Sequence, residues 1–394
     1  MPILFVTVLI DLIGFGIVIP ILPFLSPQLG ADKMDIAYIV SIYAVFAGLC
    51  GPYWGKLSDH IGRKPVLLIC LGGGALSYVM LGLATELWMI YVSRAFAGLM
   101  AGNFGVATAM IGDISSPKSR AKNMGLVGAA FGLGMVFGPF LGGVLAGDSG
   151  DFTLPCIVAG IVSVVAMLAG GLFLEESLTP EKRQVNREFH RDNKLSILAM
   201  LKNTGNRLFA CQYALHNTCV STVTYLFPLW VADLLNWGAK EVGIVFGALG
   251  VAMTIFQGGL IGPITARIGE KLFLVIGVAT MALAFGIAAI AESTTLMMVS
   301  FFLSMLGATV GIPLLNTILT GRTPAELRGK MMGTTSSMSS WGRVIGPLLS
   351  GFMLITFGYT GAWLATMFVA LLYLSWAVSQ LLEFKRKGST RQSP

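Results

Sequence analysis

The chain has 394 residues, of which 55% are hydrophobic and only 11% are charged, and its mean hydropathy is +0.80. A composition this apolar excludes a soluble globular protein, because a single fold could not hide so much apolar surface from water. The formal net charge of +7 could indicate nucleic acid as a partner, but the placement of the charges along the chain argues against it.

The hydrophobic residues are grouped into long segments. A helix needs about 20 predominantly apolar residues to cross the hydrocarbon core of a bilayer. Twelve such segments occur, at residues 2–24, 36–54, 65–84, 87–111, 123–146, 153–174, 208–233, 240–262, 271–291, 295–319, 331–355 and 360–382. We therefore predict an all-α integral membrane protein with twelve transmembrane helices, for which the lipid bilayer is the solvent.

The basic residues lie on one side of these predicted helices. Of the 26 Lys and Arg residues, 22 lie in the loops that lead from an even-numbered to an odd-numbered helix, or in the C-terminal tail. The positive-inside rule then places both termini in the cytoplasm. We expect a monomeric, multi-pass protein of the inner or plasma membrane, with no nucleic acid as a partner.

The chain contains an internal repeat. The segment Gly55–Lys64 matches Gly262–Lys271 at an offset of 207 residues, and Gly138-Pro139 recurs as Gly346-Pro347 at an offset of 208. Parallel repeats of this size are typical of one class of transporters. The predicted organisation is two pseudo-symmetric six-helix bundles at 1–174 and 208–382, a cytoplasmic linker at 175–207 that ends in an amphipathic surface helix, and a basic tail at 383–394.

Four motifs occur in order along the chain. Gly55-x-Leu-x-Asp59-x-x-Gly62-Arg63-Lys64 resembles the signature loop of the major facilitator superfamily, and Arg94-Ala-Phe-Ala-Gly98 resembles that superfamily's intramembrane arginine motif. The glycine pattern from Gly128 to Gly143 is similar to a motif of its proton-coupled exporters, and Asp11 to Pro23 completes the set. The chain thus resembles the twelve-helix drug and proton antiporters, near the tetracycline exporters, and this resemblance implies their fold and activity.

Asp11 and Arg94 are charged residues inside predicted helices. Placing a charge at the centre of a bilayer costs roughly 2.5 to 3.5 kcal/mol, so both side chains need partners or water. Burial favours the protonated form of a carboxyl group, which makes Asp11 a candidate proton carrier. We expect Arg94 to reach Asp11 directly or through water and to be released when Asp11 is protonated. The structural alternatives are local solvation of Asp11 and hydrogen bonds from Arg94 to helix-end carbonyls.

A second group of charges lies on the predicted cytoplasmic face. We expect these residues to form a latch that closes in one state of the transporter and opens in the other. The alternative is that these charges only set the topology, because exposed ion pairs contribute little. The predicted latch comprises Gly55, Asp59, Gly62, Arg63, Lys64, Asp113 and Arg120.

Predicted helix 5 is rich in glycine. Glycines four residues apart allow helices to pack closely, and Pro139 bends the helix by interrupting its hydrogen bonds. The resemblance places this helix at the interface of the two halves, although glycine-rich packing also occurs in static bundles. The motif residues are Gly134, Gly138, Pro139, Gly142 and Gly143.

Polar and aromatic side chains in the second half form a candidate substrate cavity, because polar groups facing lipid would have no partners. The predicted cavity residues are Gln212, His216, Asn217, Gln257, Asn316, Trp341 and Arg343. The alternative for His216 is a hydrogen-bonded packing residue. The alternatives for Arg343 are a charge that balances Asp11 across the cavity and a partner for the carbonyls freed near Pro347. Arg343 would favour an anionic substrate and Asp11 a cationic one, so the charge of the substrate stays open.

The sequence contains no nucleotide-binding loop and no catalytic signature such as His-Glu-x-x-His or Gly-x-Ser-x-Gly. We therefore expect no catalytic residues, no metal site and no cofactor, with protons and a small molecule as the partners. The predicted function is proton-coupled export of a small amphipathic organic compound. The alternatives are a proton-linked metabolite or sugar carrier and a membrane sensor that does not transport.

Overall fold

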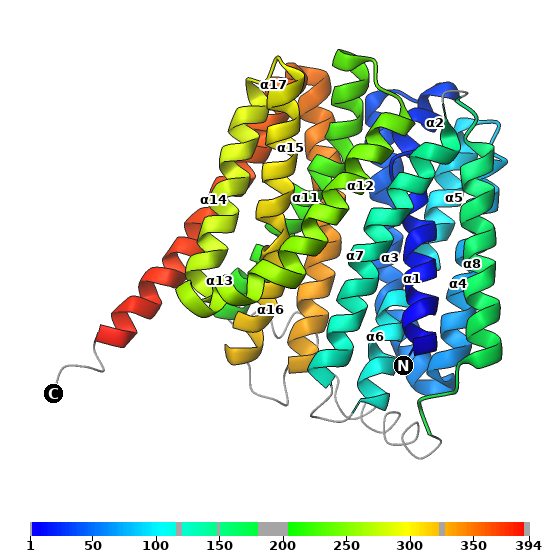
Figure 1. The fold of residues 1–394 in the computed structure, drawn as a ribbon, viewed down its shortest axis with the longest axis horizontal. Coiled ribbons are helices and arrows are strands. Elements are labelled where there is room, and N and C mark those ends of the chain that lie inside the picture. The colour runs from blue at the N-terminus through cyan, green and yellow to red at the C-terminus, as the bar shows by residue number, and fades with distance from the viewer. Residues whose placement is uncertain (1, 116–119, 148–149, 180–203, 323–327, 390–394) are drawn as a thin grey trace. The chain divides into compact units, whose positions relative to one another are not determined.

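The computed structural model describes residues 2–115, 120–147, 150–179, 204–322 and 328–389. Every regular element in these ranges is a helix (Figure 1). This is the expected outcome in lipid, because a helix satisfies its own backbone hydrogen bonds. The elements are α1 (Pro2–Val18), α2 (Leu22–Gln28), α3 (Lys33–Ile61), α4 (Arg63–Gly82), α5 (Leu87–Leu99), α6 (Asn103–Ile114), α7 (Arg120–Ala146), α8 (Thr153–Phe173), α11 (Thr204–Leu235), α12 (Ala239–Ile255), the π-helix η1 (Phe256–Leu260), α13 (Ile261–Ile268), α14 (Glu270–Ala289), α15 (Thr294–Thr309), α16 (Gly311–Arg322) and α17 (Arg328–Ser389).

Nine helical segments in the described part of the chain are long and apolar enough to cross a membrane, and ten if α1 and α2 count as one bent span. The bend of 44° between α1 and α2 follows from Pro20, which cannot continue the backbone hydrogen bonds of α1. The 62-residue α17 covers both of the last two predicted segments, with a non-helical backbone at Gly358. A count of twelve crossings remains a prediction.

The internal repeat is visible in the backbone. α3 and α4 are separated by the single residue Gly62, with φ 116° and ψ 156°, and α13 and α14 by Gly269, with φ 79° and ψ 156°. The positive φ favours glycine because a side chain there would clash with the backbone. The predicted loop 55–64 is therefore mostly helical, since α3 continues to Ile61 and α4 begins at Arg63.

The described residues form two compact units. The first consists of Met1–Lys194 with Val231–Thr254, and the second of Leu195–Trp230 with Ile255–Pro394. Within the first unit, Lys33 at the start of α3 forms an ion pair with Asp233, which ties the segment Val231–Thr254 to the first six helices. The predicted amphipathic helix of the linker, at residues 195–201, lies outside the described residues, as do the side chains of the tail 383–394.

Each unit has its own apolar core. In the first unit, Leu67, Leu71 and Val106 are buried with residues of α1, and Ile17, Ile21 and Ile39 are buried in a second cluster. In the second unit, the rings of Phe227 and Phe301 stack at 3.8 Å, and those of Trp230 and Trp363 meet at 5.2 Å. These contacts fix the helices that carry the polar residues described below.

Within the first unit, α7 lies against α1 (Figure 1). Glycines line the contact between the two helices. A Cβ atom added to Gly138 would lie 2.5 Å from the Cα of Gly16, and one added to Gly134 would lie 2.5 Å from the Cβ of Leu12. Gly142 approaches Ile17 in the same way. The two backbones are thus in direct contact, as glycine spacing in membrane helices permits.

A second face of α7 packs against α12 in the same unit. A Cβ added to Gly143 would lie 2.8 Å from the Cα of Gly243, and one added to Gly243 would lie 2.6 Å from the carbonyl oxygen of Pro139. The predicted motif residues therefore serve two contacts, with Gly134, Gly138 and Gly142 toward α1 and Gly143 toward α12.

We predict that Gly138→Ala destabilises the protein by roughly 1–3 kcal/mol, because the added methyl group forces two backbones apart. Thermal unfolding of the purified protein in detergent measures the effect. The matched control is Gly105→Ala, where no heavy atom lies within 4 Å of the added Cβ. Equal melting temperatures for the two variants would contradict the proposed backbone contact.

Candidate functional site

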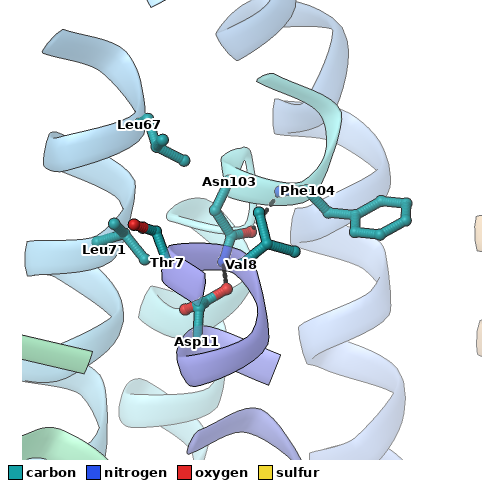
Figure 2. Close-up of a pocket in the computed structure, with 7 residues that line it drawn as sticks. All are labelled: Thr7, Val8, Asp11, Leu67, Leu71, Asn103 and Phe104. Carbon is teal, nitrogen blue, oxygen red and sulfur yellow. Dashed lines mark hydrogen bonds between the residues drawn. The ribbon is translucent and has the colours of Figure 1, made fainter. Parts of the chain in front are cut away.

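Asp11 lies in the interior of the first unit, midway along α1, and is 8% exposed. Its carboxylate accepts a hydrogen bond from the side-chain amide of Asn103, the first residue of α6 (Figure 2). The amide oxygen of Asn103 in turn accepts a 2.9 Å hydrogen bond from the backbone N–H of Phe104. This bond fixes the orientation of the amide so that its NH₂ group points to Asp11.

A break in the predicted fourth helix positions Asn103. α5 ends at Leu99 and α6 begins at Asn103, which leaves the last carbonyls of α5 without helical partners. The indole N–H of Trp54 donates a hydrogen bond to the carbonyl of Leu99, and the Trp54 ring packs against Gly102. The buried Trp54 therefore stabilises the break that turns Asn103 toward Asp11.

Asp11 and Asn103 line a small pocket. Its other walls are almost entirely apolar, and its volume is of the order of a single water molecule. Figure 2 shows Asp11 and Asn103 facing each other within it. The lining residues are Thr7, Val8, Asp11, Leu67, Leu71, Asn103 and Phe104. The ionised carboxylate accepts a hydrogen bond from the Asn103 amide, and the protonated acid can still accept it through its carbonyl oxygen. The group can therefore hold or release a proton without losing this partner.

Arg94 is buried in α5 of the same unit, with its guanidinium carbon 5.9 Å from the centre of the Tyr78 ring. No ion pair in the described residues joins it to Asp11, so the two side chains are not in direct contact in this structure, and a contact through water stays a prediction. Asp11 binds Asn103, which lies nine residues beyond Arg94 and belongs to the next helix, α6. The Nε and Nη2 atoms of Arg94 have no hydrogen-bond partner among the described residues.

The predicted latch residues form a cluster centred on Arg63. Its Nη2 lies 2.6 Å from Asp59, and its Nε lies 3.0 Å from Asp113 at the end of α6. Its Nη1 donates a 2.6 Å hydrogen bond to Ser58. The guanidinium thus joins α3, α4 and α6, as its several fixed donors allow.

Three further latch residues lie around this cluster. Gly55 belongs to the last turns of α3, and no atom would meet a Cβ added there. Gly62 forms the turn, and the backbone N–H of Lys64 donates to Glu176. The side chain of Arg120 lies outside the described residues.

Glu176 was not identified by the sequence analysis. Its two carboxylate oxygens accept hydrogen bonds from the backbone N–H groups of Arg63, at 3.0 Å, and Lys64, at 3.2 Å. These groups are the unpaired donors at the start of α4, where a negative charge is favoured by the helix dipole. The run of acidic residues after α8 was a signal, but nothing in the sequence indicated a partner more than 100 residues away.

The predicted substrate-cavity residues divide into three groups in the second unit. Gln212 and His216 are buried, whereas Gln257, Trp341 and Arg343 are exposed. Asn217 and Asn316 are half-buried and bonded within the unit, Asn217 to the carbonyl of Tyr213 and Asn316 to the Tyr213 hydroxyl at 2.8 Å. Arg343 donates a 3.0 Å hydrogen bond to Ser340. Their role in binding substrate stays a prediction.

We predict that Glu176→Ala destabilises the protein by roughly 1–2 kcal/mol, because the start of α4 loses its capping carboxylate. Thermal unfolding in detergent checks the effect. Glu175→Ala is the matched control, because Glu175 is the adjacent exposed residue with the same charge. If both variants melt alike, the capping contact does not contribute to stability.

The sequence and the fold both match known proteins of one family. The sequence model described as Major Facilitator Superfamily matches residues 4–261 and 209–393. The class G tetracycline resistance protein of Vibrio anguillarum is 31% identical over 93% of both chains, and the class C protein of Escherichia coli is 29% identical over 93% of both. The fold resembles the crystal structure of the human organic anion transporter MFSD10 (TETRAN), with a TM-score of 0.74, 24% identity and coverage of 95% of this chain and 98% of the other. The chain is therefore a multi-pass membrane transporter of the Major Facilitator Superfamily, and it is not an enzyme.

Proposed function

We propose that the protein exports a small amphipathic organic compound in exchange for protons, by alternating access across twelve transmembrane helices with both termini in the cytoplasm. The observation that carries the proposal is the buried carboxyl group of Asp11 beside Asn103. Ionisable groups inside a membrane are rare and are usually functional. Relatives named for tetracycline resistance, at about 30% identity over nearly the whole chain, support export of a compound of this kind.

The Arg63 cluster supplies a two-state element for such a cycle. Three partly buried contacts hold Arg63 to Ser58, Asp59 and Asp113, and the carboxylate of Glu176 holds the adjacent backbone. A transporter that alternates between two states needs contacts that form in one state and break in the other. The charged groups are close enough to attract each other strongly when the cluster is closed. When the cluster opens, water can hydrate each of them.

A carrier of an anionic metabolite is the second candidate function. Arg343 is exposed in the second unit, and a guanidinium recognises carboxylates and phosphates well. The structural neighbour MFSD10 is an organic anion transporter, at 24% identity. The two candidates are separated by measuring transport of an organic anion and transport of tetracycline on the same preparation and comparing the two rates. A membrane sensor would show binding with no flux of either compound.

We predict that Asp11→Asn abolishes compound-driven proton movement, because an amide cannot carry the proton. The measurement uses liposomes that contain the protein and an internal pH dye, with tetracycline added under an imposed pH gradient. The variant should show only the leak of liposomes without protein. Asp151→Asn is the matched control, since Asp151 is exposed and accepts a hydrogen bond from the Thr153 backbone that asparagine can also accept. Coupled flux that persists in Asp11→Asn would exclude the proposed role of Asp11.

We predict that Asp59→Asn slows transport about tenfold while substrate binding changes little, because Arg63 loses a charged partner in the closed cluster. Initial rates in liposomes report transport, and equilibrium titration of the purified protein reports binding. Asp32→Asn serves as the control at the opposite end of α3, where asparagine can keep the helix cap. An equal loss of binding and transport in Asp59→Asn would contradict a latch.

A further inference from the structure

Both repeats bring a titratable side chain of their first helix against a break in their fourth helix. In the first repeat, Asp11 of α1 meets Asn103 at the start of α6. In the second repeat, His216 of α11 meets Gly311 at the start of α16. At the offset of 207, Asn103 corresponds to Val310, the residue before Gly311, and His216 lies two residues before the position that corresponds to Asp11.

The His216 ring occupies the space directly above Gly311. A Cβ atom added at Gly311 would lie 2.5 Å from Nδ1 and 3.2 Å from Nε2 of His216. These distances leave no room for a side chain at position 311 unless the imidazole moves. The break between α15 and α16 is therefore shaped to receive this ring, as the break between α5 and α6 receives Asp11.

The surroundings of His216 are buried and polar. His216 is 4% exposed, and Gln212, one helical turn earlier on α11, is 0% exposed. The ring of Tyr373 from α17 lies 6.0 Å from the imidazole at an angle of 79°. Among the described residues, no hydrogen-bond partner is found for His216 Nδ1, for either amide atom of Gln212 or for the Tyr373 hydroxyl.

Among the residues that the structure describes, no charged side chain acts on the imidazole in this cluster. The titratable group that faces it is Tyr373 from α17, and α16 contributes the backbone of Gly311. Tyr213 and Cys219 of α11 act electrostatically on Tyr373. The ion pairs Lys33–Asp233, Arg63–Asp59 and Arg63–Asp113 lie in the first unit. A proton bound to His216 would thus add an uncompensated charge to this interior.

Burying a polar group without a hydrogen-bond partner costs free energy. A different arrangement of α11, α16 and α17 that gave these groups partners would therefore remove that cost. Of the three side chains, glutamine does not titrate and tyrosine titrates near pH 10, whereas histidine ordinarily changes charge between about pH 5 and 8. A proton on His216 would favour the arrangement in which water reaches the ring.

We propose that His216 is a second proton carrier, placed in the second repeat where Asp11 is placed in the first. Its imidazole binds one proton through the lone pair of a ring nitrogen when water reaches the cluster. It releases the same proton to water on the other side of the membrane as the ring returns to Gly311. This inference rests on the proposed proton antiport, and it sets the number of protons exchanged at two for each compound.

A titration of the His216 imidazole tests proton binding directly, and it does not depend on which compound the protein transports. The chain has three histidines, so His60→Gln with His190→Gln leaves His216 alone. Nitrogen NMR of this variant, labelled at histidine and embedded in lipid nanodiscs, should show the signal of the protonated ring appearing as the pH is lowered from about 8 to about 4. Free histidine, labelled in the same way and measured in the same buffers, verifies that the probe reports titration. A His216 ring that stays neutral throughout this range overturns the proposal.

The coupling ratio gives a second test with tetracycline as the probe. With the membrane potential held at zero and a pH difference of one unit, two protons for each compound sustain a concentration ratio of about 100-fold, and one proton sustains about tenfold. His216→Gln should therefore lower the ratio about tenfold. Tyr373→Phe is the matched control, since it keeps the ring beside His216, and its ratio should equal that of the wild type.

The outcomes separate this inference from the proposed function. A wild-type ratio of about tenfold, or an equal ratio in His216→Gln, overturns the second proton site and leaves proton antiport standing. A wild-type protein that moves tetracycline without protons contradicts the proposed function itself. If tetracycline is not moved, the NMR titration decides whether His216 binds a proton.

Discussion

The structure depends on one constraint, which is that a membrane interior offers no water to satisfy polar groups. Backbone groups meet this constraint through helices, and at helix breaks they need side chains, as the Trp54 indole shows at the carbonyl of Leu99. Charged side chains meet it through partners, as Asp11 does with Asn103 and Arg63 with two carboxylates. The constraint is not met at Arg94 and His216, because buried nitrogen atoms of both side chains have no hydrogen-bond partner among the described residues.

Much of this organisation could be predicted from the sequence, because hydrophobic length and charge placement are local properties. The repeat, the helical segments and the buried position of Asp11 all follow from motifs and spacing. Motifs and spacing also predict a charged cluster, but the structure, not the sequence, shows that Arg63 pairs with both Asp59 and Asp113. Partners chosen by tertiary packing could not be predicted. Asn103 faces Asp11 only because α5 ends at Leu99, and Glu176 reaches Arg63 only because the chain returns to the start of α4 after α8.

The buried state of Gln212 and His216 marks a second limit of the sequence. A polar stripe on a helix indicates a surface that avoids lipid, but it does not distinguish the wall of an open cavity from the interior of a packed bundle. The His216 ring is buried because it packs against Gly311 and Tyr373, which belong to helices about 100 and 160 residues further along the chain. Side-chain volume at these distant positions decides whether the imidazole is covered.

The two packed faces of α7 have an evolutionary consequence. Gly134, Gly138 and Gly142 touch the backbone of α1, and Gly143 touches that of α12, so selection can accept almost no larger residue at these positions. Substitutions at these glycines of α7 are therefore not expected to produce new substrate specificities. We expect natural variants with altered specificity to differ at exposed residues such as Trp341, while the glycines of α7 stay the same through divergence.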